Sequence, residues 1–429
     1  MTNQSKVRYL LAVGTLLAAI IVSATVPALA KSQSNNRQSL DPNTQFYVPK
    51  PNHGALEQIA DLTTSGDKAD ANLIKKMIET PQAVWFTKGT PKSVQQDVRN
   101  TVQRAADKGT VPVLVIYNVP GRDCSQYSAG GAATGDAYKA WINGFVAGLG
   151  AYKAVVILEP DGLALMPTDC GQPDTYNRVS LINYAAHTLL NDQNAAIYLD
   201  AGHSAWHSVG DIAARLVAGG VQDVQGFFQN VSNYQFTTNS VQYGTWISSC
   251  IAYATTINPG DFGGCPNQYW NGGPLPAKIA QLLGEWTGVA LSPYGEWSDT
   301  TNNEFLNTSG INLRYANMLG GTQPTTHFVI DTSRNGQGPW NPPPHPAGDP
   351  QDWCNPPDRG LGMRPTANSG QPLVDAYLWV KIPGESDGQC YRWTSGPLDP
   401  VRGIQDPPAG QWFPQMALEL VHNANPPLP

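Results

Sequence analysis

Charged residues are scarce in this chain. Asp, Glu, Lys and Arg make up only 14% of its 429 residues, and the formal net charge is −7. Because nucleic-acid binding normally requires a strongly basic face, this composition argues against a nucleic-acid partner. The phosphate-binding pattern G-x-x-x-x-G-K-[ST] is also missing from the sequence, and the one G-x-S-x-G match, Gly384-Glu-Ser-Asp-Gly388, lacks the strand-to-helix context of a nucleophile elbow. Nucleotide hydrolysis and a serine-hydrolase triad are therefore unsupported.

Cysteines are few as well. The chain has six, and no two of them have the C-x2-C spacing of a zinc site. In an exported protein such cysteines are more often joined in disulfides. The sequence alone leaves many connectivities open. We hypothesise that each pair ties down a loop that leaves a strand or a long insert, with the pairs Cys124–Cys170, Cys250–Cys265 and Cys354–Cys390.

Long apolar runs are missing apart from one, at residues 10–22. That run is too short to span a membrane comfortably. It follows Lys6 and Arg8 and precedes Ala28-Leu-Ala30, which is the arrangement of a secretory signal with its cleavage site. A membrane anchor is the alternative. The pattern favours export, so we expect a secreted, extracellular protein with no membrane partner.

The N-terminal segments set the domain boundaries. We expect residues 1–30 to be a signal peptide and residues 31–42, which are rich in Asn, Ser and Gln, to be a disordered leader. No internal repeat and no Pro/Ser/Thr-rich linker divides the remainder. We therefore predict one domain over residues 43–429 and a monomeric protein.

Short apolar runs alternate with amphipathic stretches along this domain. The apolar runs predict strands at residues 83–86, 112–118, 154–158, 196–200, 226–230, 327–331 and 376–381. The amphipathic stretches predict helices at residues 71–79, 93–108, 137–148, 176–191 and 212–218. For the second of these helices we expect a capping box at Ser93-Val-Gln-Gln96 and a glycine stop at Asp107-Lys-Gly109. Strands separated by helices pair in parallel, which predicts a closed or nearly closed α/β barrel.

Acidic residues follow the predicted strands. Those at or just beyond strand ends are Asp123, Asp161, Asp200, Asp331 and Asp387, and Arg122 is a possible ion-pair partner for its neighbour. Each Asp alone is more often a helix N-cap than a functional group. The carboxyl ends of parallel strands meet at one rim, however, so the set favours a site. Paired carboxylates, one kept protonated by a nearby like charge, are what cleavage of a glycosidic bond requires.

Aromatic residues are plentiful, with 12 Trp and 17 Tyr. Indole rings pack against the apolar faces of sugars. Trp85, Trp206 and Trp353 lie at strand ends or in loops of the same rim, which favours a sugar track over an ordinary place in the core. Long connections at residues 235–326, 335–369 and 385–412 would decorate that rim, and connections of this length are usually functional.

A metal site is the weaker alternative. His203-Ser-Ala-Trp-His207 has the i, i+4 spacing of a metal-binding pair. It lacks the Glu of H-E-x-x-H and follows a predicted strand instead of lying on a helix. We therefore expect neither a metal nor any other cofactor.

At these residues the chain resembles glycoside hydrolase family 6, the inverting cellulases. The resemblance covers most of the chain from Trp85 to the C-terminus. The motifs that carry it are Tyr117-Asn-Val-Pro-Gly-Arg-Asp-Cys124, Leu158-Glu-Pro-Asp161, Tyr198-Leu-Asp-Ala-Gly-His-Ser-Ala-Trp206, Asn230-Val-Ser-Asn-Tyr234, Ile330-Asp-Thr-Ser-Arg-Asn-Gly336 and Trp379-Val-Lys-Ile-Pro-Gly-Glu-Ser-Asp-Gly388. The resemblance implies a distorted, partly open parallel (β/α) barrel of about seven strands with long loops at its C-terminal face.

The resemblance also implies roles. Asp161 matches the general acid, Asp123 the carboxyl that raises the acid's pKa, and Tyr117 the tyrosine that crowds the sugar at the cleavage point. Asp387 matches a candidate base that acts directly or through water. Substrate-binding positions are matched by Trp85, Asp200, His203, Trp206, Asn233, Trp353, Lys381 and Glu385.

Two positions depart from the family pattern. A serine that often holds the catalytic water is replaced by Ala129, with Ser128 beside it, and a second indole known in some members is Val209. The second departure puts a distal subsite on the leaving-group side in doubt.

The function implied is a secreted inverting β-1,4-glucanase that acts on cellulose. The long inserts, and the run Asp406-Pro-Pro-Ala-Gly-Gln-Trp-Phe413, favour a cellobiohydrolase that releases cellobiose from non-reducing ends. An endo-β-1,4-glucanase of the same family is the alternative. A catalytically inactive sugar-binding protein is a more remote one.

Overall fold

A computed structural model describes residues 40–191, 194–275, 287–345 and 349–429. They belong to one compact unit, Arg37–Pro429. The signal peptide predicted for residues 1–30, and the leader up to residue 39, lie outside the described residues and stay predictions. Within the described ranges, no helix combines the length and the apolar character that a membrane crossing needs.

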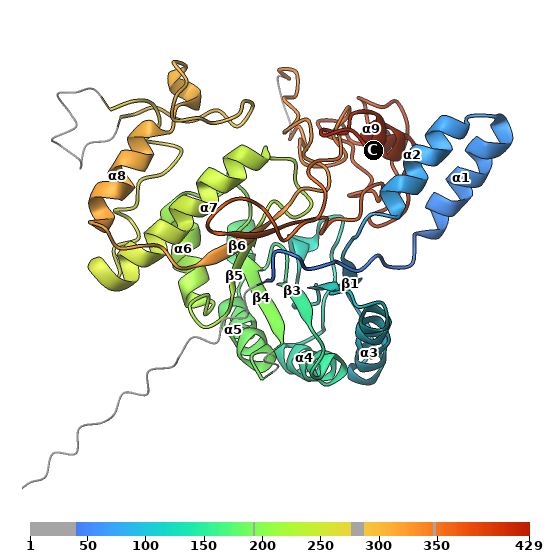
Figure 1. Cartoon of the computed structure of the whole chain (residues 1–429), viewed down its shortest axis with the longest axis horizontal. Coiled ribbons are helices and arrows are strands. Elements are labelled where there is room, and N and C mark those ends of the chain that lie inside the picture. Colours follow the sequence, from blue (N-terminus) through green and yellow to red (C-terminus); the bar gives the residue numbers. More distant parts are fainter. Residues whose placement is uncertain (1–39, 192–193, 276–286, 346–348) are drawn as a thin grey trace, which may run out of the picture. The chain divides into compact units, whose positions relative to one another are not determined.

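Seven parallel strands form one sheet in chain order, β1 to β7 (Figure 1). Their bounds are β1 Val84–Phe86, β2 Val113–Ile116, β3 Ala154–Leu158, β4 Ala195–Asp200, β5 Gly226–Gln229, β6 His327–Asp331 and β7 Val374–Leu378. Among the described residues no ladder joins β7 to β1. The backbone N–H of Ala83 instead donates to the carbonyl of Trp379 at 2.9 Å. The predicted partly open parallel barrel is confirmed.

Alternate residues of each strand face opposite sides of the sheet. In β2, Leu114 and Ile116 belong to the core between the sheet and its outer helices, whereas Val113 and Val115 belong to a second core inside the barrel. The strands β3 and β4 divide in the same way. The continuous apolar runs in the sequence reflect burial of both faces, as expected for parallel strands covered by helices.

The helices α3 to α7 cover the outside of the barrel, and their apolar faces join the outer core. The helix bounds are α1 His53–Ser65, α2 Lys68–Ile78, α3 Pro91–Asp107, α4 Gly135–Leu149, α5 Arg178–Leu189, α6 Val209–Ala218, α7 Thr237–Ala252, α8 Ser309–Leu319 and α9 Pro414–His422. Short 3-10 or π turns lie at η1 Asp123–Ser125, η2 Pro167–Cys170, η3 Tyr253–Ile257 and η4 Glu304–Leu306.

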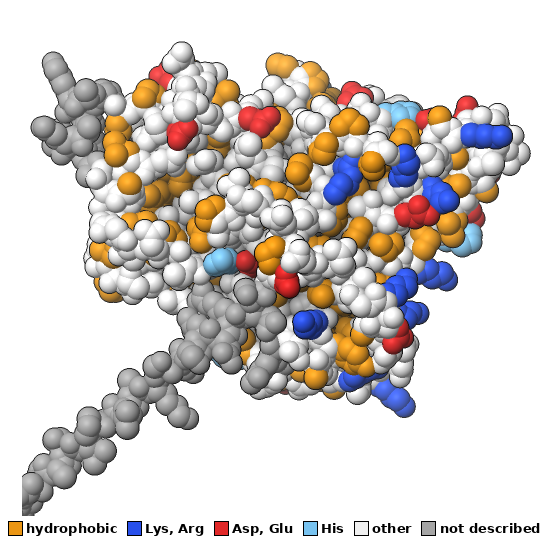
Figure 2. Space-filling model, in the orientation of Figure 1, with side chains coloured by type: hydrophobic (Ala, Val, Ile, Leu, Met, Phe, Trp, Pro, Cys, Tyr) orange, Lys and Arg blue, Asp and Glu red, His pale blue; other side chains and the backbone are white. Residues whose placement is uncertain are grey.

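Helix α9, near the C-terminus, packs beside α1 and α2, which come from the start of the described chain (Figure 1). Together they enclose a third apolar core that includes Ile74, Met77, Phe413 and Leu420. On the face drawn in Figure 2, Lys and Arg side chains gather mostly over the α1–α3 side, and the rest of this face carries few charges. This distribution agrees with the low charged fraction of the sequence.

The start of α3 differs from the prediction. The helix begins at Pro91, and its capping box is made by Thr90 and Ser93 rather than by Ser93 and Gln96. The hydroxyl of Thr90 accepts from the N–H of Ser93 at 3.1 Å. Proline is well suited to the first helical position because it has no N–H that would be left unpaired there. At the other end, Gly109 follows the helix in a left-handed conformation with φ 65°, as predicted.

Helix α7 lies in the connection that sequence patterning left without a helix. It is rich in Ser and Thr, and almost every one of its faces is buried, so it has no amphipathic period. Gly244 at its centre lets the helix approach the sheet, because a Cβ there would lie 2.4 Å from the ring of Phe328.

Strand β7 begins two residues earlier than predicted and ends at Leu378.

Three disulfides are formed, and they join the predicted pairs, Cys124–Cys170, Cys250–Cys265 and Cys354–Cys390. The first links the loop after β2 to the loop after β3. The third links two long connections at the same rim of the barrel. Two of the three therefore fix loops that carry predicted site residues.

Candidate active site

The loops after β2 and β3 deliver Asp123 and Asp161 to one cavity of about 810 Å³. Both residues have left-handed backbones, with φ 59° at Asp123 and φ 62° at Asp161. Glu159, two residues before Asp161, is left-handed as well, at φ 54°. Such conformations are costly for residues other than glycine, and they concentrate where a side chain must be aimed at a site. The chain therefore turns sharply at each strand end and directs a carboxyl into the cavity.

Asp161 is the more strongly perturbed of the two carboxyls. Burial raises its pKa well above the ordinary value, and the charges of Asp200 and Asp123 raise it further, while Arg178 opposes them. A carboxyl in this environment retains its proton to a higher pH than an ordinary carboxyl does. Asp161 can therefore donate a proton to a bound group.

Asp123 is held differently. Its Oδ2 accepts a hydrogen bond from the backbone N–H of Ser128. Burial raises its pKa, and the bond from Ser128 and the charge of Arg122 lower it in part. The suggested ion pair with Arg122 does not form among the described side chains. That guanidinium instead donates to the carbonyls of Thr87, Tyr117 and Ser128.

Tyr117 lines the same cavity as the two carboxyls. Its ring lies edge-on to Trp85, with centroids 5.5 Å apart, and under the guanidinium of Arg122 at 4.5 Å. Burial and the charges of Asp161 and Asp123 raise the pKa of its hydroxyl well above the ordinary value. The hydroxyl therefore stays protonated and can donate a hydrogen bond into the cavity.

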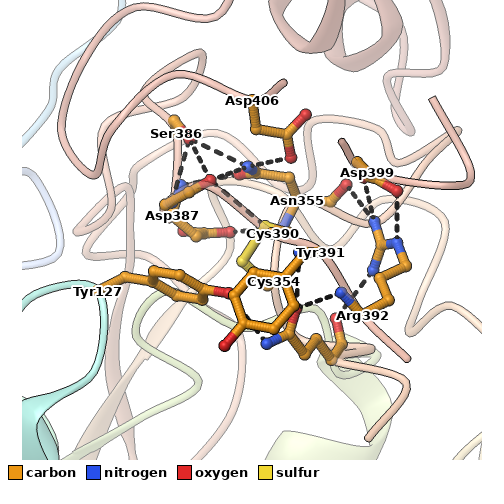
Figure 3. Close-up of a disulfide and its surroundings, with 12 residues drawn as sticks. Tyr127, Cys354, Asn355, Ser386, Asp387, Cys390, Tyr391, Arg392, Asp399 and Asp406 are labelled. Carbon is orange, nitrogen blue, oxygen red and sulfur yellow. Dashed lines mark hydrogen bonds and ion pairs between the residues drawn. A yellow bond between two sulfur atoms is a disulfide. The ribbon is translucent and has the colours of Figure 1, made fainter. Parts of the chain in front are cut away.

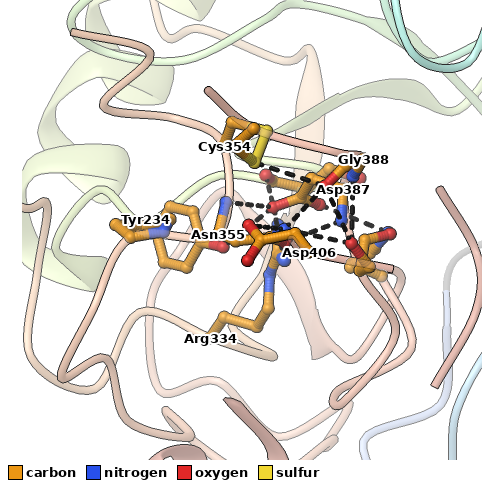
Figure 4. A network of polar contacts seen from close by, with 12 residues as sticks. Tyr234, Arg334, Cys354, Asn355, Asp387, Gly388 and Asp406 are labelled. Carbon is orange, nitrogen blue, oxygen red and sulfur yellow. Dashed lines mark hydrogen bonds and ion pairs between the residues drawn. A yellow bond between two sulfur atoms is a disulfide. The ribbon is translucent and has the colours of Figure 1, made fainter. Parts of the chain in front are cut away.

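Asp387 lines the same cavity from the loop after β7, but its surroundings are cationic (Figure 4). Arg334 lies 2.9 Å from Oδ2, and Lys381 lies 3.3 Å from Oδ1. Oδ2 also accepts from the hydroxyl of Tyr234 and from the backbone N–H of Asn355, each at 3.1 Å. Burial alone would raise the pKa of Asp387, but Arg334 and Lys381 hold it below its ordinary value. Asp387 is therefore an anion.

Not every predicted carboxyl reaches the cavity. Asp200 and Asp331 are buried and do not line it. Asp200 accepts from the backbone N–H groups of Leu163, Ala164 and Gly202, at 2.8 to 3.2 Å. Asp331 accepts from Ser232, Ser333, Val380 and Lys381. Both side chains bind loop backbones behind the cavity wall, and Asp200 acts on the site through its charge.

The predicted substrate-binding residues other than Asp200 do line the cavity; they are Trp85, His203, Trp206, Asn233, Trp353, Lys381 and Glu385. Burial, and next His207, lower the pKa of His203 to about 3, so its imidazole is neutral. Glu385 accepts from the side-chain amide of Asn52 at 2.8 Å. A residue just before α1 therefore supports a predicted site residue far away in the sequence.

Sequence reasoning missed the residues that hold the two carboxyl-bearing loops together. Glu159 is buried and accepts from the N–H groups of Asn118 and Val119 at 2.9 and 3.0 Å. Arg178, at the start of α5, donates to the carbonyls of Pro120 and Gly121 at 2.9 and 3.2 Å. The Glu-Pro-Asp triplet contained a signal for Glu159, because a buried carboxylate at a strand end needs partners. Arg178 follows no strand and carried no such signal.

Other residues that line the cavity come from loops. Pro293, Tyr294, Pro339 and Asp352 belong to the long connections, and Tyr127, Ser128 and Ala129 belong to the loop after β2. Val209, the second departure, is buried at the start of α6 and provides no surface for a sugar. These loop residues follow no periodic pattern, so spacing could not identify them.

The two histidines considered for a metal do not converge on one. His207 Nε2 contacts the carbonyl of Ala164 at 2.6 Å, and its ring stacks on Trp206. Across the part of the chain that the structure describes, no group of three or more His, Cys, Asp or Glu side chains could hold a metal ion.

Comparison with known proteins gives a consistent result. The sequence model described as glycosyl hydrolases family 6 matches residues 41–424. "Endoglucanase A" of Cellulomonas fimi is 33% identical over 384 residues, which cover 89% of this chain and 62% of that protein. This chain therefore spans less than two thirds of that relative. "Probable 1,4-beta-D-glucan cellobiohydrolase C" of Aspergillus fumigatus is 29% identical over 384 residues, covering 81% of this chain and 70% of that protein.

A solved structure supports the same relationship. The endoglucanase Cel6 from Mycobacterium tuberculosis, in complex with methyl-cellobiosyl-4-deoxy-4-thio-β-D-cellobioside, is 32% identical and superposes with a TM-score of 0.62. The match covers 90% of this chain and 99% of that one.

Proposed function

This chain belongs to glycosyl hydrolases family 6, and from that membership we propose that it is a secreted, inverting β-1,4-glucanase that hydrolyses cellulose. The observation that carries the proposal is the shared cavity of Asp123, Asp161 and Asp387. The pKa of Asp161 is raised there, whereas the pKa of Asp387 is lowered. Titratable groups whose environments push their pKa values apart identify acid and base roles. Disulfides at the rim agree with an oxidising, extracellular setting.

Asp161 is proposed as the general acid. As the bond between C1 and the glycosidic oxygen breaks, its proton passes to that oxygen, and the leaving chain departs as an alcohol. Asp123 keeps Asp161 protonated before the reaction and stabilises positive charge that develops on the sugar. Tyr117 crowds the ring at the cleavage point and favours its distortion.

Asp387 is proposed to assist the attacking water through at least one further water. Its Oδ2 is occupied by Arg334, Tyr234 and Asn355. Only Oδ1 remains to contact a water, and Nζ of Lys381 lies 3.3 Å from it. A carboxylate with a lowered pKa is a weak base, so a relay and a fixed negative charge suit it better than direct proton abstraction. Ser128 lines the same cavity and is the proposed residue to hold that water.

Sugar units are proposed to bind along the remaining walls. Trp85, Trp206 and Trp353 offer faces for pyranose rings, and Lys381 and Glu385 offer partners for hydroxyl groups. A β-1,4-glucan chain is therefore the proposed partner. The neutral imidazole of His203 can both donate and accept a hydrogen bond.

A cellobiohydrolase is the preferred form of this activity. Residues from all three long connections line the cavity, namely Tyr294, Pro339 and Trp353, and Gly410. Burial, and next the charge of Asp352, raise the pKa of Tyr294, so the first two of these connections lie within electrostatic reach of each other. Walls built from several long loops favour entry of a chain end. An endoglucanase is the second candidate, because Endoglucanase A of Cellulomonas fimi is 33% identical.

Two measurements test the proposal. Hydrolysis of cellohexaose followed by proton NMR should give the α-anomer first, and early β-product would contradict an inverting mechanism. Cellobiose should dominate the soluble products, and the viscosity of carboxymethylcellulose should fall slowly. A rapid fall in viscosity would establish the endoglucanase instead. No increase in reducing ends when the wild type is incubated with cellohexaose, although cellohexaose still binds, would identify an inactive sugar-binding protein.

A further inference from the structure

Asn355 connects the cavity wall to the interior of the protein (Figure 3). It follows Cys354 of the third disulfide, is fully buried, and has a left-handed backbone with φ 39°. Its backbone N–H donates to Oδ2 of Asp387 at 3.1 Å, and its side-chain Oδ1 accepts from the N–H of Asp387 at 2.7 Å. Asn355 thus fixes both the backbone and one carboxylate oxygen of Asp387.

The amide nitrogen of Asn355 has more acceptors than it has hydrogens. Nδ2 lies 3.0 Å from Ser386 Oγ, 2.9 Å from the carbonyl of Gly388 and 2.9 Å from Oδ2 of Asp406. An amide nitrogen carries two donors. An ionised acceptor forms the strongest of such bonds. The carboxylate of Asp406 and the carbonyl of Gly388 both only accept, so together they hold the nitrogen end of the amide away from the Asp387 N–H, and the ionised Asp406 forms the stronger of the two bonds.

Asp406 does not face the cavity, so it cannot contact a bound sugar directly. It is 1% exposed. Its Oδ1 is buried and has no hydrogen-bond partner among the described residues. A buried carboxylate with one bare oxygen is unfavourable for folding, so its presence behind Asp387 calls for a functional reason.

The charged groups that face Asp406 are largely committed to other partners. Arg392 forms two bonds of 2.9 Å with Asp399, and both side chains are fully buried. Arg402 pairs with Glu419, with Nη2 2.8 Å from Oε2. Burial raises the pKa of Asp406 to about 6; the bond from Asn355 lowers it, Asp399 raises it, and Arg402 and Arg392 lower it.

We propose that Asp406 is a positioning residue for Asp387: together with the carbonyl of Gly388, Asp406 holds the amide of Asn355 in the orientation that presents its oxygen to the Asp387 backbone (Figures 3 and 4). The catalytic part of this inference rests on the proposed function, because it gives Asp387 a role in activating water. The positioning is active when Asp406 is ionised. Once Asp406 is protonated, its bond to the amide loses the assistance of the charge, and Asn355 and Asp387 are held less firmly.

The test compares wild type, Asp406→Asn and the control Asp358→Asn on cellohexaose. Asp358 is exposed, lies three residues from Asn355 and has φ 58°, a conformation that Asn tolerates. Above pH 7, kcat of Asp406→Asn should be roughly tenfold below that of wild type, with KM within about twofold, because a small misplacement of a reacting group costs rate. The ratio of the two kcat values should approach one below pH 5. Asp358→Asn should match wild type throughout.

The thermal stability of Asp406→Asn distinguishes the positioning role from a merely structural role, because a structural role predicts that the substitution lowers Tm. The pKa of Asp406 is raised by folding, so its ionised form destabilises the folded state above about pH 6. Asp406→Asn removes that charge, and its Tm at pH 7 should equal or exceed that of wild type. A lower Tm together with a pH-independent loss of kcat would overturn the proposal. So would an unchanged kcat. If Asp406→Asn does not fold, Asp406→Ser carries the same expectations, and failure of both to fold would establish a structural role.

NMR of the Asn355 side-chain amide separates this inference from the proposed function. In wild type its resonances should shift with a midpoint near pH 6, and in Asp406→Asn that transition should be absent. The transition would remain if the wild type did not hydrolyse cellohexaose, a result that would refute only the proposed function. Its absence from wild type would refute the positioning role.

Discussion

The guanidinium of Arg334 lies 2.9 Å from the carboxylate of Asp387, and the two side chains are 0% and 6% exposed. Lys381 approaches the other carboxylate oxygen at 3.3 Å. Two cations around one anion, with all three side chains largely buried, form a preorganised electrostatic centre rather than a surface ion pair. The pKa of Asp387 therefore stays below its ordinary value despite burial.

Breaking this pair should be costly. Replacement of Arg334 by Met leaves a buried carboxylate with Lys381 as its remaining cation, and we expect a loss of about 3–5 kcal/mol in unfolding free energy at pH 7. Because folding lowers the pKa of Asp387, its contribution is present above the unfolded pKa and disappears as pH falls through the folded value. Urea denaturation at pH 7 and at pH 3 measures both effects. The double variant with Asp387→Asn should recover part of the loss, and strictly additive losses would argue against direct coupling.

Removal of the proposed acid should depend on the leaving group. We expect Asp161→Ala to lower kcat on cellohexaose by roughly 10²- to 10⁴-fold, the usual size of general-acid catalysis. A dinitrophenyl cellobioside, whose leaving group needs no proton, should lose much less. Steady-state kinetics on the two substrates measures this difference, and circular dichroism checks the fold. Equal losses on both substrates would remove Asp161 from the acid role.

The charge of Asp200 should be visible in the pH profile. Its own pKa is raised to about 6, so it is ionised at the alkaline limb of the profile, where it raises the pKa of Asp161. Asp200→Asn removes that charge and lowers the pKa of Asp161, so the acid loses its proton earlier. The alkaline limb of kcat should move to lower pH by roughly one unit. A limb that stays in place would show that Asp200 only holds the backbone.

Two disulfides offer a matched comparison. Cys124–Cys170 closes a separation of 46 residues and adjoins Asp123, whereas Cys250–Cys265 closes 15 and does not line the cavity. Replacing either pair by Ala should cost roughly 2–5 kcal/mol of stability. Only the first replacement should lower kcat, because it releases the loop that carries a predicted catalytic carboxyl. Thermal unfolding and kcat at a temperature where both variants are folded measure the contrast. An equal effect on kcat would contradict the assignment.

The sheet was predictable because burial on both faces leaves an uninterrupted apolar run. The segment from Val113 to Ile116 shows this pattern. The position of Asp123 in the loop after this strand also predicted its place in the site. The disulfide pairs were a hypothesis among many possible connectivities, and the structure confirms it. The strands and the site carboxyl depend on short stretches of sequence, and short stretches are what patterns of composition and spacing record.

What could not be predicted depends on long-range contacts. Asp200 and Asp161 both follow strands, yet only Asp161 lines the cavity, because the fold brings the N–H groups of Leu163 and Ala164 to Asp200. Helix α7 has no amphipathic period, because neighbours bury it on nearly all sides. The depressed pKa of Asp387 requires Arg334, which lies 53 residues away in the chain. Local spacing contains none of this information.

The unpaired edges of β1 and β7 bear on how a polymer is handled. In a fully closed barrel the rim of the strands surrounds a site that is enclosed on all sides, which suits a small, compact molecule. Here Trp85, from β1, and Lys381, just beyond β7, line the same cavity. The cavity therefore extends across the gap between these two edge strands. A cavity lined from both edges of the sheet suits the extended β-1,4-glucan chain proposed as its substrate.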